Sequence, residues 1–377
     1  MFRPLALLIA LAVTPALAAP APTSSLDDTR IQSIVDTAQG TGRSSGGIPT
    51  FGASAGGSSR QTGVSGGTLS TGEHTLRYYR FTTDPGSGFA EKFFVFEPVP
   101  KPTSPRPLLV SFHAFGVTQN DILVNTSFME ECAKRGWYLL APLSASGGHF
   151  MSQPGQINTR AALDLTLAGF NVDEQRIYGV GFSMGGGMAL NFAARNLVPA
   201  GGMFAAVVVH TGAVDLNDSY RDDPSSQFIF DFWYGDGSPG TADPFQMLKA
   251  SLFEYDDVAQ QVDPDTDLAR NLAHVPIYML RAEFDPLVDL AEQHDRLYAI
   301  LAGQGRPPGP AFTHEIVPSV DVHKWSTLDA AKACDWMAQF TLDLPSSGRT
   351  LAIKEGTHFH FFVDQQVVGG LTPITWE

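Results

Sequence analysis

From residue 74 onward the chain alternates short apolar stretches, which are typical of buried strands, with stretches whose apolar residues recur at helical spacing. The stretches that predict strands are residues 75–81, 92–98, 107–113, 137–142, 176–182, 203–210, 275–280 and 311–317. The stretches that predict helices are residues 121–135, 157–170, 184–197, 287–303 and 326–342. Alternation of this kind predicts an α/β fold, with a mostly parallel sheet and helices on both of its faces.

One interval in this alternation is too long for a simple crossover. Residues 211–274 contain no clear core strand, whereas a crossover between parallel strands needs only a dozen or so residues. The excess, at about 214–270, predicts a lid inserted after the sixth strand, over the carboxyl edge of the sheet. Its aromatic residues either line an apolar acyl or aryl site or form the core of the lid: Phe228, Phe230, Phe232, Trp233 and Tyr234.

The two ends of the chain differ from this middle part in composition. Residues 1–18 combine an early arginine, a short apolar run and a small-residue A-x-A site, which predict a secretory signal peptide. Residues 19–73 begin with a stretch, 26–38, that favours a short helix, but they are mostly Gly, Ser and Thr and predict a flexible linker, with order beginning near His74. Residues 344–377 form an aromatic-rich tail with room for short strands.

Composition and charge narrow the classes of function. A hydrophobic share of 43% allows one large core, which we place at residues 74–343. A formal net charge of -15 argues against nucleic acids and anionic membrane surfaces as partners, because Coulomb repulsion opposes docking. No later apolar run is long enough to span a bilayer. We therefore expect a soluble, exported protein, secreted or periplasmic, without membrane insertion, and the oligomeric state stays open.

The sequence Gly181-Phe182-Ser183-Met184-Gly185 lies between a predicted strand and a predicted helix, which is the context that a G-x-S-x-G nucleophile elbow requires. A serine at such an elbow sits on a sharp turn, and a Cβ at a flanking glycine position would collide with a neighbouring strand or helix. The motif therefore predicts a nucleophilic serine above the carboxyl edge of the sheet. An ordinary glycine-rich turn without chemistry is the alternative.

A serine hydroxyl needs an imidazole to accept its proton and a carboxylate to orient that imidazole, and after this elbow they follow in the order acid, then histidine. We predict Asp285, in the loop after a strand, as the acid, with Glu283 and Asp289 as alternatives. We predict His323, in a loop before the last helix, as the base. Its rivals lie in a strand, at strand ends or in the tail: His314, His113, His210, His358 and His360.

Attack by the serine creates a negatively charged oxygen that needs preplaced hydrogen-bond donors. One predicted donor is the backbone N–H of Met184, directly after the serine. The other should come from the loop after the strand at 107–113, where Phe115 is the preferred donor and Ala114 the alternative, because this loop turns at Gly116.

The stretches PLLVSFHAFG, VDEQRIYGVGFSMGGGMAL, AEFDPLV and VHKW together resemble secreted α/β-hydrolase esterases of the poly(3-hydroxybutyrate) depolymerase, feruloyl esterase and acetylxylan esterase type. The resemblance covers roughly residues 90–342 and implies the α/β-hydrolase fold, with the roles given above for the serine, the acid, the base and the two donors. Those enzymes usually have His-Gly-Cys where this chain has His113-Ala114-Phe115. They also often carry a separate polymer- or carbohydrate-binding module, which this sequence does not reveal.

These residues predict an exported serine carboxylesterase that acts on a small-molecule or oligomeric ester through an acyl-enzyme, with no metal or organic cofactor. Trp233, Phe232, Tyr234 and Trp325 are candidate substrate-binding residues. A serine peptidase of the prolyl-oligopeptidase class would share the elbow and the triad. A catalytically inactive hydrolase fold used for binding is the second alternative.

The two cysteines, Cys132 and Cys334, lie in the helix after the third strand and in the last helix. In the family that the chain resembles, these helices pack side by side on one face of the sheet. Export would supply an oxidising compartment, so we expect a disulfide between them. Two separate buried thiols, acting as small hydrophobic groups, are the alternative.

Overall fold

The computed structural model describes residues 60–71, 74–262, 267–318, 323–353, 356–359, 361–364 and 370–376. The predicted signal peptide at 1–18 and the predicted helix at 26–38 lie outside the described residues. Within the described ranges, no helix is both long enough and apolar enough to cross a membrane.

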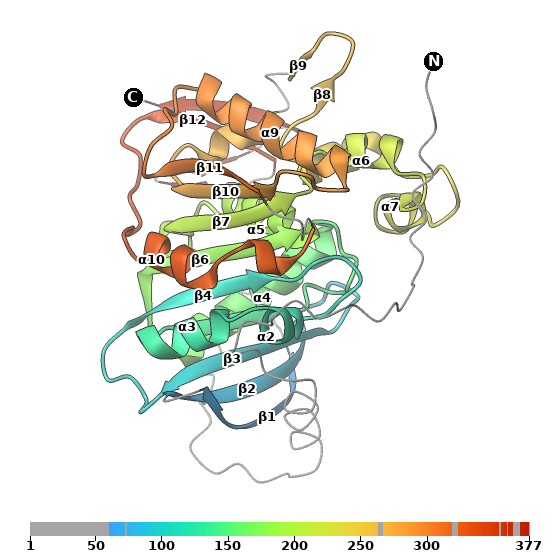
Figure 1. The fold of residues 1–377 in the computed structure, drawn as a ribbon. Helices are drawn as coiled ribbons and strands as arrows, with labels where there is room; N and C mark the ends of the chain where they lie inside the picture. The colour runs from blue at the N-terminus through green and yellow to red at the C-terminus, as the bar shows by residue number, and fades with distance from the viewer. Residues whose placement is uncertain are drawn as a thin grey trace.

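A nine-stranded sheet forms the centre of the molecule, in the order β1-β2-β3-β5-β4-β6-β7-β10-β11 (Figure 1). Its strands are β1 Arg60–Thr71, β2 His74–Asp84, β3 Glu91–Val99, β4 Arg106–Phe112, β5 Tyr138–Pro142, β6 Val172–Ser183, β7 Ala206–Gly212, β10 Ile277–Ala282 and β11 Phe312–Val317. The pairs from β1 to β5 are antiparallel, and the pairs from β5 to β11 are parallel. The parallel strands therefore bring their carboxyl ends to one edge, as the sequence predicts.

Helices cover both faces of this sheet (Figure 1). On one face pack α4 Gln153–Gly169, α5 Met184–Arg195 and α9 Val288–Gly303, and on the other pack α2 Asp121–Asn125, α3 Phe128–Arg135 and α10 Ala330–Met337. Consecutive strand residues serve the two hydrophobic cores in turn: Leu108 and Val110 contribute to the first, and Leu109 to the second. The predicted α/β layering is confirmed.

The interval predicted as a lid contains short helices and a small hairpin. They are α6 Leu216–Asp222, α7 Gln227–Tyr234, α8 Pro244–Ala250, β8 Tyr255–Asp256 and β9 Gln261–Val262. Helix α7 buries Phe230 and Tyr234 in the core that contains α5, whereas Phe228 and Phe232 on the same helix are exposed. Its aromatic residues are thus divided between the packed core and the surface.

Strand β1 falls inside the segment predicted as a flexible linker, so the predicted start of order at His74 is too late. The prediction failed because β1 uses small residues, which are also typical of linkers, to pair closely with β2. Gly66 lies opposite Tyr79 and Gly67 lies opposite Tyr78, and a Cβ at Gly67 would come within 2.8 Å of the Tyr78 hydroxyl oxygen. A flexible linker and a strand of this kind can both be rich in glycine. Only the pairing with a neighbouring strand distinguishes the two.

One other predicted segment is also more divided than the sequence pattern suggests. The predicted helix at 121–135 is two helices, because the backbone is extended at Thr126, whose hydroxyl donates to the Ile122 carbonyl and accepts from the Phe128 amide. The tail forms short strands, β12 Gly348–Ala352, β13 Gly356–His358, β14 Phe361–Val363 and β15 Thr372–Trp376.

Helices α3 and α10 pack on the same face, as expected, but the predicted disulfide between Cys132 and Cys334 is not formed. Both thiols are free and buried among apolar side chains. Burial raises the pKa of the Cys132 thiol well above its usual value and that of Cys334 to about 12, which keeps both groups protonated and disfavours oxidation. Arg135 instead links the two helices by an ion pair with Asp335.

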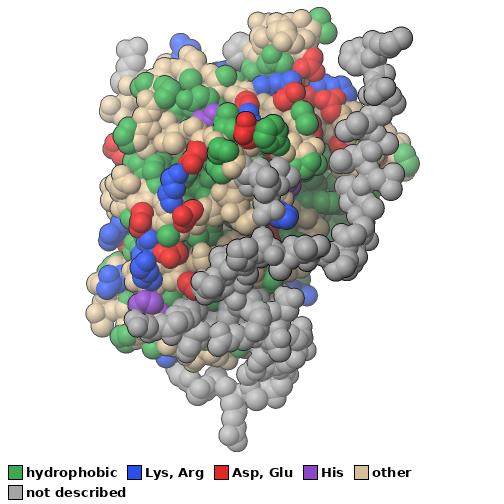
Figure 2. All heavy atoms as spheres, in the orientation of Figure 1, with side chains coloured by type: hydrophobic (Ala, Val, Ile, Leu, Met, Phe, Trp, Pro, Cys, Tyr) green, Lys and Arg blue, Asp and Glu red, His purple; other side chains and the backbone are tan. Residues whose placement is uncertain are grey.

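Acidic and basic side chains are interspersed on the face seen in Figure 2. Several surface cations are paired with carboxylates, for example Lys332 with Glu315 at 2.6 Å and Arg281 with Asp295 at 2.8 Å. Because the exposed Lys332 pair is screened by water, it contributes little to the free energy of folding.

Candidate active site

Strand β6 ends at Ser183 and helix α5 begins at the next residue, so the serine occupies a sharp turn between the two. Its backbone has φ 58° and ψ -126°, a combination that side chains with a Cβ rarely adopt. Such strain persists only where the surrounding structure enforces it, and it places a side chain where regular structure would not. The geometry is that of the predicted elbow.

The glycines around the serine are required by close packing. A Cβ at Gly181 would collide with the carbonyl of Gly185, and a Cβ at Gly185 would collide with the carbonyl of Phe112 and come within 2.6 Å of that of His113. The first turn of α5 therefore lies directly against the end of β4. This close approach explains why the serine is surrounded by so little side chain.

The structure brings Ser183, His323 and Asp285 together from three separate segments. His323 Nε2 lies 3.0 Å from Ser183 Oγ, and His323 Nδ1 lies 3.0 Å and 2.9 Å from the two carboxylate oxygens of Asp285. With the Nδ1 proton donated to the carboxylate, Nε2 is free to accept the hydroxyl proton. The Asp285 side chain is fully buried, and the imidazole is 16% exposed.

The Asp285 carboxylate is held by two further donors. The amide of Leu287 donates to Oδ1 at 3.0 Å and the hydroxyl of Thr211 donates to Oδ2 at 3.2 Å. Of the alternative acids, Glu283 is exposed and Asp289 lies in the first turn of α9. Thr211 is not among the residues predicted from the sequence; it stands near the end of β7 with φ 45°, a backbone strain that no sequence motif indicates.

The rival histidines have other partners. His210 is buried beside Thr211, whose hydroxyl lies 3.0 Å from its Nδ1, and burial, with a smaller contribution from the charge of His323, lowers the pKa of His210 to about 3. His113 contacts the carbonyls of Ala114 and Leu143 and so ties two loops together. Two further rival histidines lie within the described ranges. His314 contacts Asp295, and His358 contacts Thr350.

The two predicted oxyanion donors have free amides. Met184 is the first residue of α5, so its N–H has no acceptor within the helix. Among the described residues the Phe115 amide has no acceptor either, whereas the amide of Ala114, the alternative donor, donates to Asp121 Oδ2 at 3.0 Å. The loop is held in place by Gly116, whose amide donates to the Gly147 carbonyl at 2.8 Å.

Asp121 is a further residue that the sequence analysis missed. Its carboxylate is buried and accepts from the Ala114 amide, from the indole N–H of Trp325 at 2.8 Å and from the amide of the Asn125 side chain at 2.7 Å. Because Trp325 lies two residues after His323, one carboxylate joins the loop that carries Phe115 to the loop that carries the base. A helix-initiating aspartate is common in sequences, and nothing in the pattern marked this one.

The predicted substrate-binding residues lie in different places. Trp325 is 5% exposed and packs with Phe182 and Phe128, and its role in substrate binding stays a prediction. Phe232 is exposed on α7, at 53%. Trp233 and Tyr234 line a cavity whose lining includes neither the serine nor the histidine. Within the described ranges, no three His, Cys, Asp or Glu side chains form a group that could hold a metal ion.

No protein-family model matches the chain, and no curated protein matches its sequence. Among solved structures, the S-formylglutathione hydrolase from Agrobacterium tumefaciens superposes with a TM-score of 0.50 at 13% identity, over 74% of this chain and 99% of that one. An acetyl xylan esterase from Paenibacillus sp. R4 gives 0.49 at 13% identity, over 74% and 88%. A thermostable esterase gives 0.46 at 18% identity, over 70% of this chain and 63% of that one. The first of these likenesses confirms the α/β-hydrolase fold.

Replacing Gly185 by Ala should lower the free energy of unfolding by about 3 kcal/mol, because the added methyl group has no room between α5 and the end of β4. Urea denaturation measures this difference. Gly303→Ala at the end of α9 is the control, since a Cβ there meets nothing within 4 Å, and its stability should be unchanged or slightly higher. Equal stability of the two variants would contradict the close packing.

Asp121→Ala should lower the free energy of unfolding by about 2 kcal/mol, because it leaves the Ala114 amide and the Trp325 indole N–H buried without an acceptor. Asp121→Asn keeps one acceptor oxygen and should recover most of this loss. Urea denaturation followed by tryptophan fluorescence compares the three proteins. If Asn were as damaging as Ala, the acceptor would not be what these two loops require.

Proposed function

We propose that this protein is a serine carboxylesterase, which cleaves ester bonds through an acyl-enzyme on Ser183. The single observation that carries the proposal is the chain of contacts from Ser183 Oγ through His323 to the buried carboxylate of Asp285. A hydroxyl, an imidazole and a carboxylate in this order are the groups that acyl transfer needs. The strained elbow that presents the hydroxyl supports the same conclusion.

In the first half of the reaction, His323 Nε2 accepts the proton of the Ser183 hydroxyl as Oγ forms a bond to the carbonyl carbon of the ester. The carbonyl oxygen becomes negatively charged and accepts hydrogen bonds from the amides of Met184 and Phe115. His323 then donates its proton to the leaving alcohol oxygen as the bond between carbon and that oxygen breaks. The serine is left acylated.

In the second half, water takes the place of the alcohol. His323 accepts a proton from the water as its oxygen attacks the acyl carbon, and returns that proton to Ser183 Oγ when the carboxylic acid leaves. The positive charge that His323 carries in both steps faces the Asp285 carboxylate. Its neighbour His210 has a pKa lowered to about 3 by burial, so it stays neutral and adds no competing positive charge.

Exposed apolar side chains next to these groups favour esters with an apolar part. Phe284 directly precedes Asp285 and is 70% exposed, and Val288 follows shortly after it at 60%. Phe115 is 37% exposed and packs on Phe150, whose amide donates to the sulfur of Met184 at 3.4 Å. Small or oligomeric esters with apolar acyl groups therefore fit this surface better than strongly charged ones.

Ser183→Ala should reduce kcat for p-nitrophenyl esters by a factor on the order of 10⁶ without changing the fold, because the triad acts as a unit. The assay uses acetyl, butanoyl and octanoyl esters in parallel with peptide anilides, and circular dichroism checks folding. A phosphonate probe should label Ser183. Labelling of another serine, or faster cleavage of the anilides than of the esters, would contradict the proposal and favour a peptidase.

Matched variants separate the roles within the triad. His323→Ala should cost about as much activity as the serine variant, and Asp285→Ala should cost less, because the carboxylate orients and stabilises the imidazole without exchanging its proton. His314→Ala serves as the control, since that histidine pairs with Asp295 and not with the triad, and it should keep its activity. An inactive His314 variant beside an active His323 variant would overturn the assignment.

We also propose that the protein is exported, on the strength of the charged start, apolar run and A-x-A site in residues 1–18. Expressed in a bacterium with a general secretion system, the exported protein should begin at Ala19, as N-terminal sequencing would show. Leu8→Arg places a charge in the apolar run and should retain the chain in the cytoplasm. Export that is unaffected by this change would contradict the proposal.

A further inference from the structure

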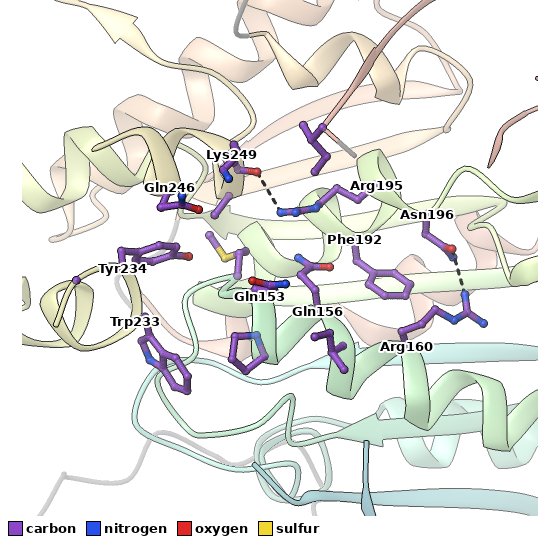
Figure 3. A pocket seen from close by; sticks show the side chains of 16 residues that line it. Gln153, Gln156, Arg160, Phe192, Arg195, Asn196, Trp233, Tyr234, Gln246 and Lys249 are labelled. Atoms are coloured by element: carbon purple, nitrogen blue, oxygen red, sulfur yellow. Dashed lines mark hydrogen bonds between the residues drawn. The ribbon is translucent and has the colours of Figure 1, made fainter. Parts of the chain in front are cut away.

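The cavity lined by Trp233 and Tyr234 has a volume of about 580 Å³ and lies away from the triad, on the face of the sheet that carries α4 and α5. Figure 3 shows side chains from α4, α5, α7 and α8 around it. Phe192 and Arg195 line it from the last turns of α5, roughly 14 to 18 Å along the helix axis from Ser183 at the other end. None of the triad residues is among its lining residues.

The charged side chains that line this cavity are all cations: Arg160, Arg195 and Lys249. No Asp or Glu lines it, although the chain as a whole carries a net charge of -15. Arg160 is balanced by an ion pair with Asp164. A local excess of positive charge in an acidic protein attracts anions to one place.

Arg195 and Lys249 have no carboxylate partner in the described part of the chain. Arg195 donates from Nη1 to the Lys249 carbonyl at 3.1 Å and contacts Asn191 Oδ1 at 3.5 Å, which leaves its other N–H groups without an acceptor among the described residues. The ammonium of Lys249 lies 5.2 Å from the centre of the Phe245 ring. Burial lowers the pKa of the Arg195 guanidinium to about 10, so its positive charge is held at a cost that a bound anion would offset.

The rest of the lining is a mixture of apolar and amide side chains. Trp233, Phe192 and Ile157 supply apolar surface, and Gln153 and Gln156 supply hydrogen-bonding groups. An inorganic anion would leave the aromatic surface unused, and a neutral apolar molecule would leave the two cations unpaired. The lining therefore matches a molecule that has both a carboxylate and an apolar body.

We propose that this cavity binds an organic carboxylate, with the carboxylate group held by Arg195 and Lys249 and the apolar body placed against Trp233 and Phe192. The proposal does not depend on the proposed esterase activity, because it concerns different residues and binding without a chemical step. It assigns a ligand site to the region between the core helices α4 and α5 and the helices α7 and α8 of the predicted lid.

Isothermal titration calorimetry of the purified protein with benzoate tests the proposal. Benzamide, which has the same shape but no charge, should bind at least tenfold more weakly, because it forms no charge-assisted hydrogen bond with the cations. Inorganic phosphate should also bind at least tenfold more weakly, since it has no apolar body to bury. Equal affinity for benzoate and for either of these probes would overturn the proposal.

Substitutions of the two cations test whether benzoate binds in this cavity. Lys249→Met and Arg195→Met should each weaken benzoate binding about tenfold, while Lys332→Met, which removes a cation from the opposite face of the sheet, should leave it unchanged. Thermal melting checks that each variant is folded, and Lys249→Met alone decides the question if Arg195→Met does not fold. Hydrolysis of p-nitrophenyl acetate serves as an independent measurement and should not change in Lys249→Met. Benzoate binding that is intact in a folded Lys249→Met protein would overturn the proposal.

Discussion

Close packing of the first turns of α5 against the carboxyl ends of β4 and β7 is the constraint on which the rest of the site depends. Carbonyl groups of β4 and of the residues after it occupy the space where a Cβ of Gly185 would lie, and the β7 side chain Val209 lies within 2.9 Å of the Cβ position of Gly186. With the helix pressed this far into the sheet edge, the connection from β6 has no relaxed route, and Ser183 takes up the strain at φ 58°. The position of the Ser183 hydroxyl and the free amide of Met184 both follow from that one packing arrangement.

The loops that complete the site are fixed by buried carboxylates. Asp285 accepts from the Leu287 amide and the Thr211 hydroxyl as well as from His323. Two of the three donors that hold its carboxylate are therefore independent of the imidazole. Asp121 accepts from both the Ala114 amide and the Trp325 indole N–H, and it thereby links the Phe115 loop to the His323 loop. Buried carboxylates with several donors are rigid supports, because moving any partner would leave a buried polar group unpaired.

The charged groups near the two ends of α5 differ. Near its N-terminus a buried carboxylate faces a single imidazole, and the adjacent His210 is kept neutral by burial, so the field at the serine comes from few groups. Near its C-terminus two cations face a cavity without a carboxylate partner among the described residues. One helix therefore borders two regions of opposite character, one with a serine, an imidazole and a buried carboxylate in contact and the other with unpaired positive charge.

The sequence by itself determined the α/β layering and singled out Ser183, Asp285 and His323, which the fold brings into contact, because both depend on local patterns: apolar periodicity, a glycine-flanked serine, and loops that follow strands in order. It did not reveal β1, since glycines that pair with Tyr78 and Tyr79 look like glycines of a linker. The free state of the two cysteines, the burial of Trp325, and the parts played by Thr211 and Asp121 also came from the tertiary structure alone. Each of these depends on contacts between segments far apart in the chain, and such contacts leave no trace in the spacing of neighbouring residues.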